Sequence, residues 1–190
     1  MLKAIIFDWH GVLDHTTFGG LIKILSTFTS KSREETLSVI SEYDLKYRLG
    51  QLDPDEFWKL VGKTLHLNKK ELNTACHYLL KIDKNKELWK KLPKLKRYYK
   101  LAILSDCPLD KAGQIRKKID LTPFTVVNFS SETGISKTSP KSFLNIVKAL
   151  QIKPMNCLHI DDKEKHLLNA KKLGFRTVLF KSVKDLESAL

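Results

Sequence analysis

The sequence is short of cysteine, of acidic side chains and of long apolar runs. Its 3 cysteines lie far apart and form no Cys-x-x-Cys pair, so neither a disulfide framework nor a zinc site is indicated. No apolar stretch approaches the roughly 18 residues of a membrane span. The apolar stretch near the start is too short, and meets charge too soon, for a signal peptide. We therefore expect a cytoplasmic globular protein with free thiols.

The shortage of acids leaves a strongly basic chain. Its 190 residues include 34 Lys and Arg against 21 Asp and Glu, which gives a formal net charge of +13. The densest basic segment, residues 84–100, also carries Trp89, Tyr98 and Tyr99. No nucleic-acid motif accompanies these lysines, and they are spread around an expected helix, so we favour a solvated basic surface over nucleic-acid binding. A positive field would still attract a phosphorylated substrate.

The first strand ends at a carboxylate. Residues 4–7 are a continuous apolar run, as a fully buried parallel strand requires, and Asp8 follows directly. Gly11 permits a tight turn, and Val12 and Leu13 supply apolar side chains that could close over the acid. An acid at this end of a strand can be a nucleophile or a metal ligand, because ligands of open α/β sheets gather there. The alternative is a helix-capping or solvated loop carboxylate.

Residues 16–83 have helical periodicity and no strand pattern, which predicts a helical insertion of at least four short helices. Asp53 with Glu56, and Asn68 with Glu71, have the spacing of reciprocal N-terminal caps. The apolar positions that recur at three-to-four spacing are Leu21, Ile24, Leu25, Phe28, Leu37, Ile40, Leu45 and Leu49. Those expected to face inward are Phe57, Trp58, Leu60 and Val61.

Strand and helix patterns alternate through the rest of the chain. Strands are expected at 100–104, 124–129, 157–160 and 177–180, and helices at 87–94, 109–118, 140–150, 163–173 and 183–190. This alternation predicts an α/β fold, a Rossmann-like parallel sheet between two helical layers. Residues 1–15 and 84–190 would form this core, and residues 16–83 would form a cap domain.

Polar residues follow three of the expected strands. Asp8 follows the first, Ser105 and Asp106 the second, and Asp161 and Asp162 the fourth. These strand ends lie along one edge of a parallel sheet, so the side chains can meet. Facing acids repel unless a cation lies between them, and oxygen ligands suit a hard ion such as Mg²⁺.

A lysine and a serine beside such a metal would complete a phosphoryl pocket. Lys137, in a polar loop, is the best placed lysine. It and the metal would offset phosphoryl charge, a Ser105 hydroxyl would donate to one oxygen, and Asp8 could attack phosphorus in line.

Four ordered motifs carry a family resemblance: FDWHGVLD, AILSDCP, GISKTSPKSF and IDDKEKHLLNAKKLG. In this order and at strand ends or loops they resemble the haloacid dehalogenase-like hydrolase superfamily. The helical insertion after the first motif is similar to the cap of its phosphoglycolate phosphatase and β-phosphoglucomutase-like members.

The resemblance implies roles for particular residues. Asp8 would be the nucleophile that forms an aspartyl phosphate, and Ser105, Asp106 and Lys137 would bind the phosphoryl group. Asp162 would be the metal ligand of the fourth motif, with Asp161 beside it; both belong to the expected metal site together with Asp8 and the His10 backbone carbonyl. The usual Pro-Asp after the lysine is Thr138-Ser139 here.

His10 departs from the family pattern, which has an acid/base Asp at this position. Its carbonyl can still bind a metal, and an imidazole can in principle protonate a leaving alcohol and later deprotonate water. If His10 serves poorly, alkyl ester hydrolysis should slow by roughly 10²- to 10⁴-fold, whereas acyl phosphates and aryl esters should suffer less. The alternatives are a noncatalytic His10 in a silent relative, and His15 as a second candidate acid.

The sequence thus predicts a Mg²⁺-dependent phosphatase, monomeric or dimeric, that acts on a small phosphorylated metabolite. The rival from another class is a catalytically silent protein that binds a phosphorylated ligand or an anionic partner. Two other chemistries of the superfamily fit less well. Its dehalogenases usually have Tyr at the second position and need no metal, and its phosphonate hydrolases use a cap lysine, for which Lys23 or Lys46 could be proposed.

Overall fold

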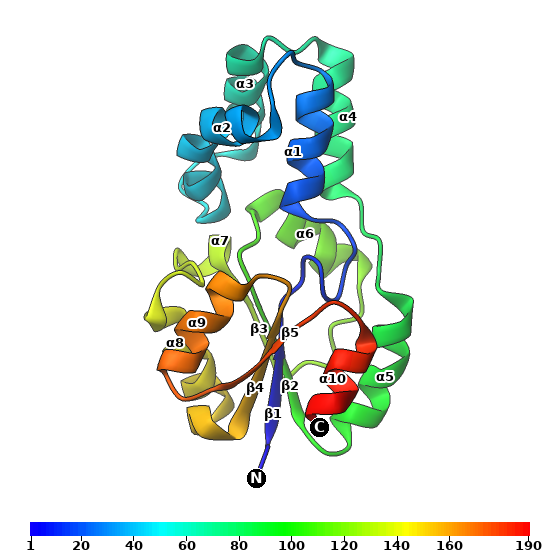
Figure 1. The fold of residues 1–190 in the computed structure, drawn as a ribbon, viewed down its shortest axis with the longest axis vertical. Coiled ribbons are helices and arrows are strands. Elements are labelled where there is room, and N and C mark those ends of the chain that lie inside the picture. Colours follow the sequence, from blue (N-terminus) through cyan, green and yellow to red (C-terminus); the bar gives the residue numbers. More distant parts are fainter.

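A parallel sheet with strand order β3-β2-β1-β4-β5 lies between two helical layers in the computed structural model, which describes residues 1–190 (Figure 1). The strands are β1 (Ala4–Phe7), β2 (Lys100–Ser105), β3 (Val126–Phe129), β4 (Cys157–Asp161) and β5 (Arg176–Leu179). β1 is central, and Phe7 lies opposite Ile103 of β2 and Ile160 of β4. The ends of β1, β2 and β4 therefore meet, and the predicted α/β class is confirmed.

Helices cover both faces of the sheet and form a separate group above it (Figure 1). They are α1 (Phe18–Thr27), α2 (Arg33–Arg48), α3 (Pro54–Leu65), α4 (Lys69–Leu80), α5 (Lys86–Lys96), α6 (Leu109–Lys118), α7 (Ser130–Thr133), α8 (Pro140–Leu150), α9 (Glu164–Lys172) and α10 (Val183–Ala189), with a 3₁₀ turn at Pro154–Asn156. No helix is both long and apolar enough to cross a membrane.

Side chains of β1 alternate between the two faces of the sheet. Ile5 and Phe7 pack into a cluster that includes residues of α5, α6 and α10, whereas Ala4 and Ile6 pack against α8 and α9. Because both faces are covered, the strand is apolar throughout and all four residues are fully buried.

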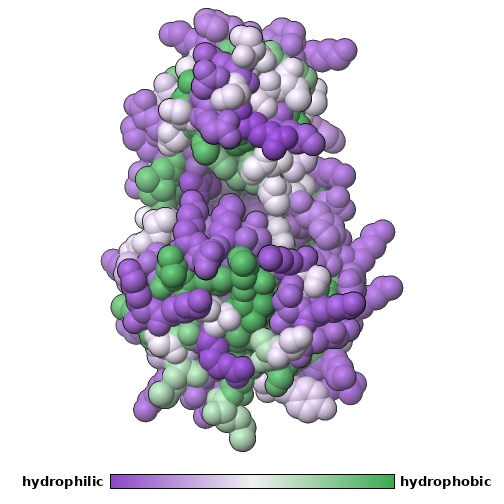
Figure 2. Space-filling view, in the orientation of Figure 1, coloured by the Kyte–Doolittle hydropathy of each residue, from purple (hydrophilic) through white to green (hydrophobic).

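Helices α1 to α4 have an apolar core of their own, in which Tyr47 stacks on Phe57 with ring centroids 3.8 Å apart. This is the helical insertion expected after β1, and we call these four helices the cap. Figure 2 shows a mainly hydrophilic face, with apolar side chains gathered over the half of the molecule that contains the sheet.

Some details differ from the sequence pattern. Leu37 and Leu45 are exposed, because Ile40 and Tyr47 form the buried side of α2 instead. Asp53 caps α3 without a reciprocal bond from its predicted partner, since its side chain accepts from the Asp55 amide. The capping box at Asn68 and Glu71 does form.

Two strands and one cap position also deviate slightly. β3 begins at Val126 because Phe124 closes a turn, its amide donating to the Leu121 carbonyl. β5 lies one residue earlier than expected. Leu60 is only partly buried on α3.

The two chain segments that join the cap to the sheet are bonded to each other. The His15 amide donates to the Asp83 carbonyl at 2.8 Å, and the Asp83 amide donates to the Asp14 carboxylate at 2.8 Å. The fully buried Lys111 donates from α6 to the Lys81 carbonyl and, at 3.3 Å, to the Thr16 hydroxyl. The buried ammonium of Lys111 thus donates to both of the segments that join the cap to the sheet.

Candidate active site

Asp8 lies at the carboxyl end of the central strand and is 4% exposed. Its amide donates to the Ile160 carbonyl of β4 at 2.9 Å, which fixes its backbone to the neighbouring strand. Its Oδ1 accepts from the Trp9 amide at 2.6 Å and from the Ser105 hydroxyl at 2.7 Å. The carboxylate is therefore held by β2 and by its own loop.

Lys137 contacts the other oxygen of the same carboxylate. Its Nζ lies 2.7 Å from Asp8 Oδ2 and 2.6 Å from Asp161 Oδ2, and the side chain is 1% exposed. Burial would lower the pKa of Lys137, but the charges of Asp8, Asp161 and Asp106 outweigh it and hold that pKa above its ordinary value. The lysine is a fixed cation between two strand-end acids.

Asp161 is fully buried, and both its oxygens are occupied. Besides Lys137, it accepts from the Lys163 amide at 2.9 Å, and it lies 3.0 Å from His166 Nδ1 and 3.4 Å from His159 Nε2. Burial would raise its pKa, but the charge of Lys137 and the neighbouring His159 and His166 keep the pKa well below its usual range. Asp161 therefore stays ionised and orients Lys137.

Asp162 has a different environment. It is half-buried and packs on Gly11, where an added Cβ would lie 2.5 Å from its Oδ2. Its Oδ1 is buried without a hydrogen-bond partner. Burial, and next the charge of Asp8, raise the pKa of Asp162 to about 6. Asp162 is thus an acid close to Asp8, and one of its oxygens accepts no hydrogen bond.

His10 points its Nδ1 at the Thr16 carbonyl, 3.2 Å away. A carbonyl oxygen only accepts, so the ring proton belongs on Nδ1, and Nε2 carries the lone pair in the neutral ring. Burial, and next the charge of Lys111, lower the pKa of His10 to about 4. At neutral pH the imidazole is therefore uncharged and better suited to accept a proton than to donate one.

A divalent ion fits the oxygen atoms around Asp8. The orphaned Asp162 Oδ1 and the His10 carbonyl, which accepts no hydrogen bond, are free to ligate it beside Asp8. Ligand atoms of Asp8, Asp161 and His166 also lie within 4.8 Å of one another. Lys137 and the Lys163 amide already occupy the Asp161 oxygens, and a hard ion prefers oxygen to imidazole nitrogen. Asp8, Asp162 and the His10 carbonyl are therefore the better ligand set.

A cavity of about 600 Å³ lies between the cap and the sheet edge. Its lining combines acids and bases of both parts with an apolar wall from the cap. The lining residues are Asp8, His10, Phe18, Gly19, Leu21, Ile22, Arg33, Glu34, Leu37, Ser41, Asp44, Tyr47, Arg48, Leu79, Asp106, Pro108, Lys137, Lys163, Lys165 and His166. A small charged molecule in this cavity would lie beside Asp8 and beneath the cap.

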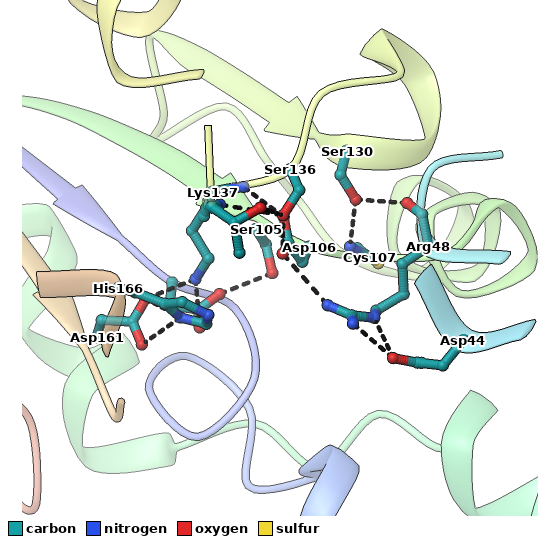
Figure 3. A network of polar contacts seen from close by, with 12 residues as sticks. Asp44, Arg48, Ser105, Asp106, Cys107, Ser130, Ser136, Lys137, Asp161 and His166 are labelled. Atoms are coloured by element: carbon teal, nitrogen blue, oxygen red, sulfur yellow. Dashed lines mark hydrogen bonds and ion pairs between the residues drawn. The ribbon is translucent and has the colours of Figure 1, made fainter. Parts of the chain in front are cut away.

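Asp106 does not offer its side chain to a phosphate. One carboxylate oxygen accepts from the Lys137 amide and the other from Ser136 and Arg48 (Figure 3). A carboxylate would also repel a phosphate. The Asp106 backbone amide, in contrast, has no hydrogen-bond partner and directly follows Ser105.

Several residues of the site were not predicted from the sequence. Arg48 and Asp44 come from the cap, and only the docking of α2 brings them to the sheet edge. His166 had a usable signal, because the first turn of the helix after β4 lies next to that strand's end. Three side chains weighed earlier lie elsewhere: His15, Lys23 and Lys46 are exposed and do not line the cavity.

Residues 2–174 match the haloacid dehalogenase-like hydrolase family. The chain belongs to this family. The resemblance carried by the four motifs is thereby confirmed at the level of a haloacid dehalogenase-like hydrolase. Comparison with curated proteins finds no match.

Solved structures share the fold of this haloacid dehalogenase-like hydrolase. The HAD family enzyme BT-2542 from Bacteroides thetaiotaomicron, in complex with magnesium and inorganic phosphate, is 21% identical, with a TM-score of 0.79 and 100% of each chain covered. A HAD-like family hydrolase from Porphyromonas gingivalis is 23% identical, with a TM-score of 0.73 and 93% of this chain and 90% of that chain covered.

A third structure shows that the same fold serves another chemistry. The L-2-haloacid dehalogenase from Xanthobacter autotrophicus, with chloropropionic acid covalently bound, is 18% identical, with a TM-score of 0.66 and 98% of this chain and 81% of that chain covered. At such identities the likeness establishes the fold, so the reaction has to be argued from the site itself.

Proposed function

We propose that this hydrolase is a Mg²⁺-dependent phosphatase that acts on a small phosphorylated metabolite through an aspartyl phosphate on Asp8. The surroundings of Asp8 carry the proposal. Ser105 and Lys137 contact its two oxygens, and Asp162 lies beside it with an unpartnered oxygen. These are the groups that in-line phosphoryl transfer requires: a nucleophile, fixed donors and a place for a hard cation. The magnesium and phosphate bound by BT-2542 support the same assignment.

In the first half-reaction an Asp8 oxygen attacks phosphorus, and the bond between phosphorus and the leaving-group oxygen breaks. Lys137 and Ser105, which contact the carboxylate of the free site, would then contact the phosphoryl oxygens. The unpartnered amide of Asp106 is a further donor for them. Fixed donors of this kind stabilise developing charge without reorganising.

Mg²⁺ would be held by Asp8, Asp162 and the His10 carbonyl, with Asp161 beside them. When bound it would neutralise charge on the phosphoryl oxygens and align them with the nucleophile. Asp161 acts in this proposal mainly through its contact with Lys137.

In the second half-reaction water attacks phosphorus of the aspartyl phosphate, and His10 Nε2 accepts a proton from the water. The bond between phosphorus and the Asp8 oxygen breaks, which releases inorganic phosphate and regenerates the Asp8 carboxylate. The same uncharged ring carries its proton on Nδ1, bonded to the Thr16 carbonyl, and so has none on Nε2 to give a leaving alkoxide in the first half-reaction. We therefore expect substrates whose leaving groups depart as stable anions, such as acyl phosphates or aryl esters. The alternative, a silent family member that binds a phosphorylated ligand or an anionic partner, would follow if His10 cannot accept the proton.

The remaining expectations belong to the same proposal. We assign residues 16–83 to the cap domain and residues 1–15 and 84–190 to the core, because the insertion has its own apolar cluster. Its position after β1 supports the phosphoglycolate phosphatase and β-phosphoglucomutase-like branch. A cytoplasmic location and the absence of nucleic-acid binding stay predictions.

Turnover of acetyl phosphate and p-nitrophenyl phosphate, with and without Mg²⁺, tests the proposal. Asp8→Asn should abolish Mg²⁺-dependent turnover because it removes the nucleophile and keeps the side-chain shape. Asp120→Asn, an exposed change on the same fold, should leave turnover unchanged. Turnover that persists in Asp8→Asn would refute the proposed nucleophile.

A further inference from the structure

The loop that carries Lys137 is held by a carboxylate of the neighbouring motif. The Lys137 amide donates to Asp106 Oδ1 at 2.8 Å, and the Ser136 hydroxyl donates to Asp106 Oδ2 at 2.7 Å (Figure 3). All three side chains are at least nine-tenths buried. Asp106 therefore fixes the backbone from which the ammonium of Lys137 reaches Asp8.

A side chain of the cap holds that carboxylate in turn. Arg48, the last residue of α2, lies with its Nη1 3.2 Å from Asp106 Oδ2 (Figure 3). Its Nε donates to Asp44 at 2.9 Å, which fixes the guanidinium plane. Because a guanidinium keeps its charge at any ordinary pH, Arg48 offsets the negative charge that Asp106 brings to a phosphate pocket.

The backbone of Arg48 joins the same segment by a second route. Its carbonyl accepts from the Ser130 hydroxyl at 2.5 Å, and that hydroxyl accepts from the Cys107 amide at 3.0 Å. Cys107 directly follows Asp106. The end of α2 is thus bonded to Asp106 directly and to Cys107 through the Ser130 hydroxyl.

We propose that Arg48 and Asp106 are positioning residues through which the docked cap holds Lys137 in its phosphate-binding position. When α2 moves away, Asp106 loses its cation, and the carboxylate that anchors the loop at residues 134–139 is held less firmly. The inference rests on the proposed function only in taking Lys137 as the phosphate-binding group. According to this inference, the positive charge of Arg48 balances the negative charge of Asp106 only while the cap is docked.

Hydrogen–deuterium exchange of residues 134–139 tests the link without any substrate. Arg48→Gln should speed exchange in this loop by roughly tenfold, since it removes a charge-assisted hydrogen bond. Asp106→Asn should do the same, because an amide keeps an acceptor for Lys137 but no longer attracts Arg48. The double variant should exchange no faster than either single variant. Lys46→Gln, on the same helix but exposed, is the matched control.

The cap should stay docked in these variants because Tyr47 also donates to Asp110 of α6, at 2.7 Å. Unchanged exchange in β1 would show that the fold is intact. Unchanged exchange of residues 134–139 in both Arg48→Gln and Asp106→Asn would overturn the inference.

Kinetics then separate a positioning role from a general structural one. With p-nitrophenyl phosphate and Mg²⁺, Arg48→Gln should lower kcat roughly tenfold with a smaller change in KM. In a Lys137→Ala background the same substitution should cause no further loss, because its effect passes through Lys137. An equal loss in both backgrounds would contradict the inference. If the loop loosens but even the unmodified protein shows no turnover, the positioning inference holds and the proposed phosphatase activity fails.

Discussion

At the scale of single residues, Asp162 lowers the stability of the metal-free protein when it is ionised. Its raised pKa, about 6 against an ordinary 3.8, means that ionising it opposes folding. The penalty is absent below about pH 4 and grows as the pH rises through about 6. Ionised Asp162 beside Asp8 therefore lowers the stability of the folded protein, and a cation bound between the two carboxylates would offset that loss.

Asp162→Asn should consequently stabilise the metal-free protein. Near neutral pH we expect a gain of about 1 kcal/mol, because solvent screens a half-buried charge. The gain should vanish towards pH 4, where the acid is protonated in both folded and unfolded chains. Urea unfolding across this pH range measures it. Addition of Mg²⁺ should stabilise the unmodified protein and not the variant; a variant less stable at neutral pH would contradict the assignment.

His10 sets the preference for leaving groups. His10→Asp should raise turnover of alkyl phosphates by roughly 10- to 100-fold, because a carboxylic acid near a metal site can donate the proton that the neutral ring lacks. Aryl and acyl phosphates should gain much less. Comparing alkyl with aryl substrates on both proteins gives the ratio, and His10→Ala controls for loss of the ring. No gain with any substrate would favour the silent alternative.

At the scale of elements, the contact between α2 and α7 requires a glycine at residue 50, because there is no room for a side chain. Gly50 has φ +70°, and an added Cβ would lie 2.5 Å from the Ser131 carbonyl oxygen. Backbone cannot yield as a flexible side chain does. A residue larger than glycine would therefore push the end of α2, and Arg48 with it, away from the sheet edge.

Gly50→Ala should destabilise the protein more than Gly134→Ala. Both glycines have positive φ, but an added Cβ at Gly134 meets no atom within 4 Å. Gly134→Ala should cost about 1 kcal/mol from backbone strain alone, and Gly50→Ala should add the clash. Thermal unfolding of the two variants isolates the contact. Equal losses would show that the cap end accommodates the methyl group.

At the scale of the whole molecule, the net charge of +13 acts on encounter rather than on chemistry. A positive protein attracts a phosphorylated substrate over distances that salt screens. The cavity itself is lined by both acidic and basic side chains, so the long-range attraction comes from the rest of the surface.

Raising ionic strength should therefore lower kcat/KM severalfold and leave kcat nearly unchanged. Steady-state kinetics with p-nitrophenyl phosphate at low and high salt, at constant free Mg²⁺, measure the effect. A parallel measurement of Mg²⁺ affinity excludes displacement of the metal. A fall in kcat instead would show that salt disturbs the bound complex.

Much of the fold followed from local pattern. The apolar run at residues 4–7, the helical spacing after residue 16 and the alternation beyond residue 86 each reflect a periodicity that burial imposes on a chain. The bounds of β1, α6 and α8 match the expected ranges. The spacing did not fix the buried side of α2, where Leu37 and Leu45 are exposed, because the helices packed against α2 choose that side.

The sequence by itself determined the sheet, the insertion after β1 and the polar residues at the strand ends, because short-range periodicity and the geometry of parallel strands dictate them. Only the tertiary structure decided which of those groups are bonded to one another and which remain without a partner. It showed both Asp161 oxygens occupied, one Asp162 oxygen without a partner, and Arg48 brought from the cap to Asp106. The contact between Arg48 and Asp106 joins residues 58 positions apart, and side-chain packing, which no local pattern encodes, selects it.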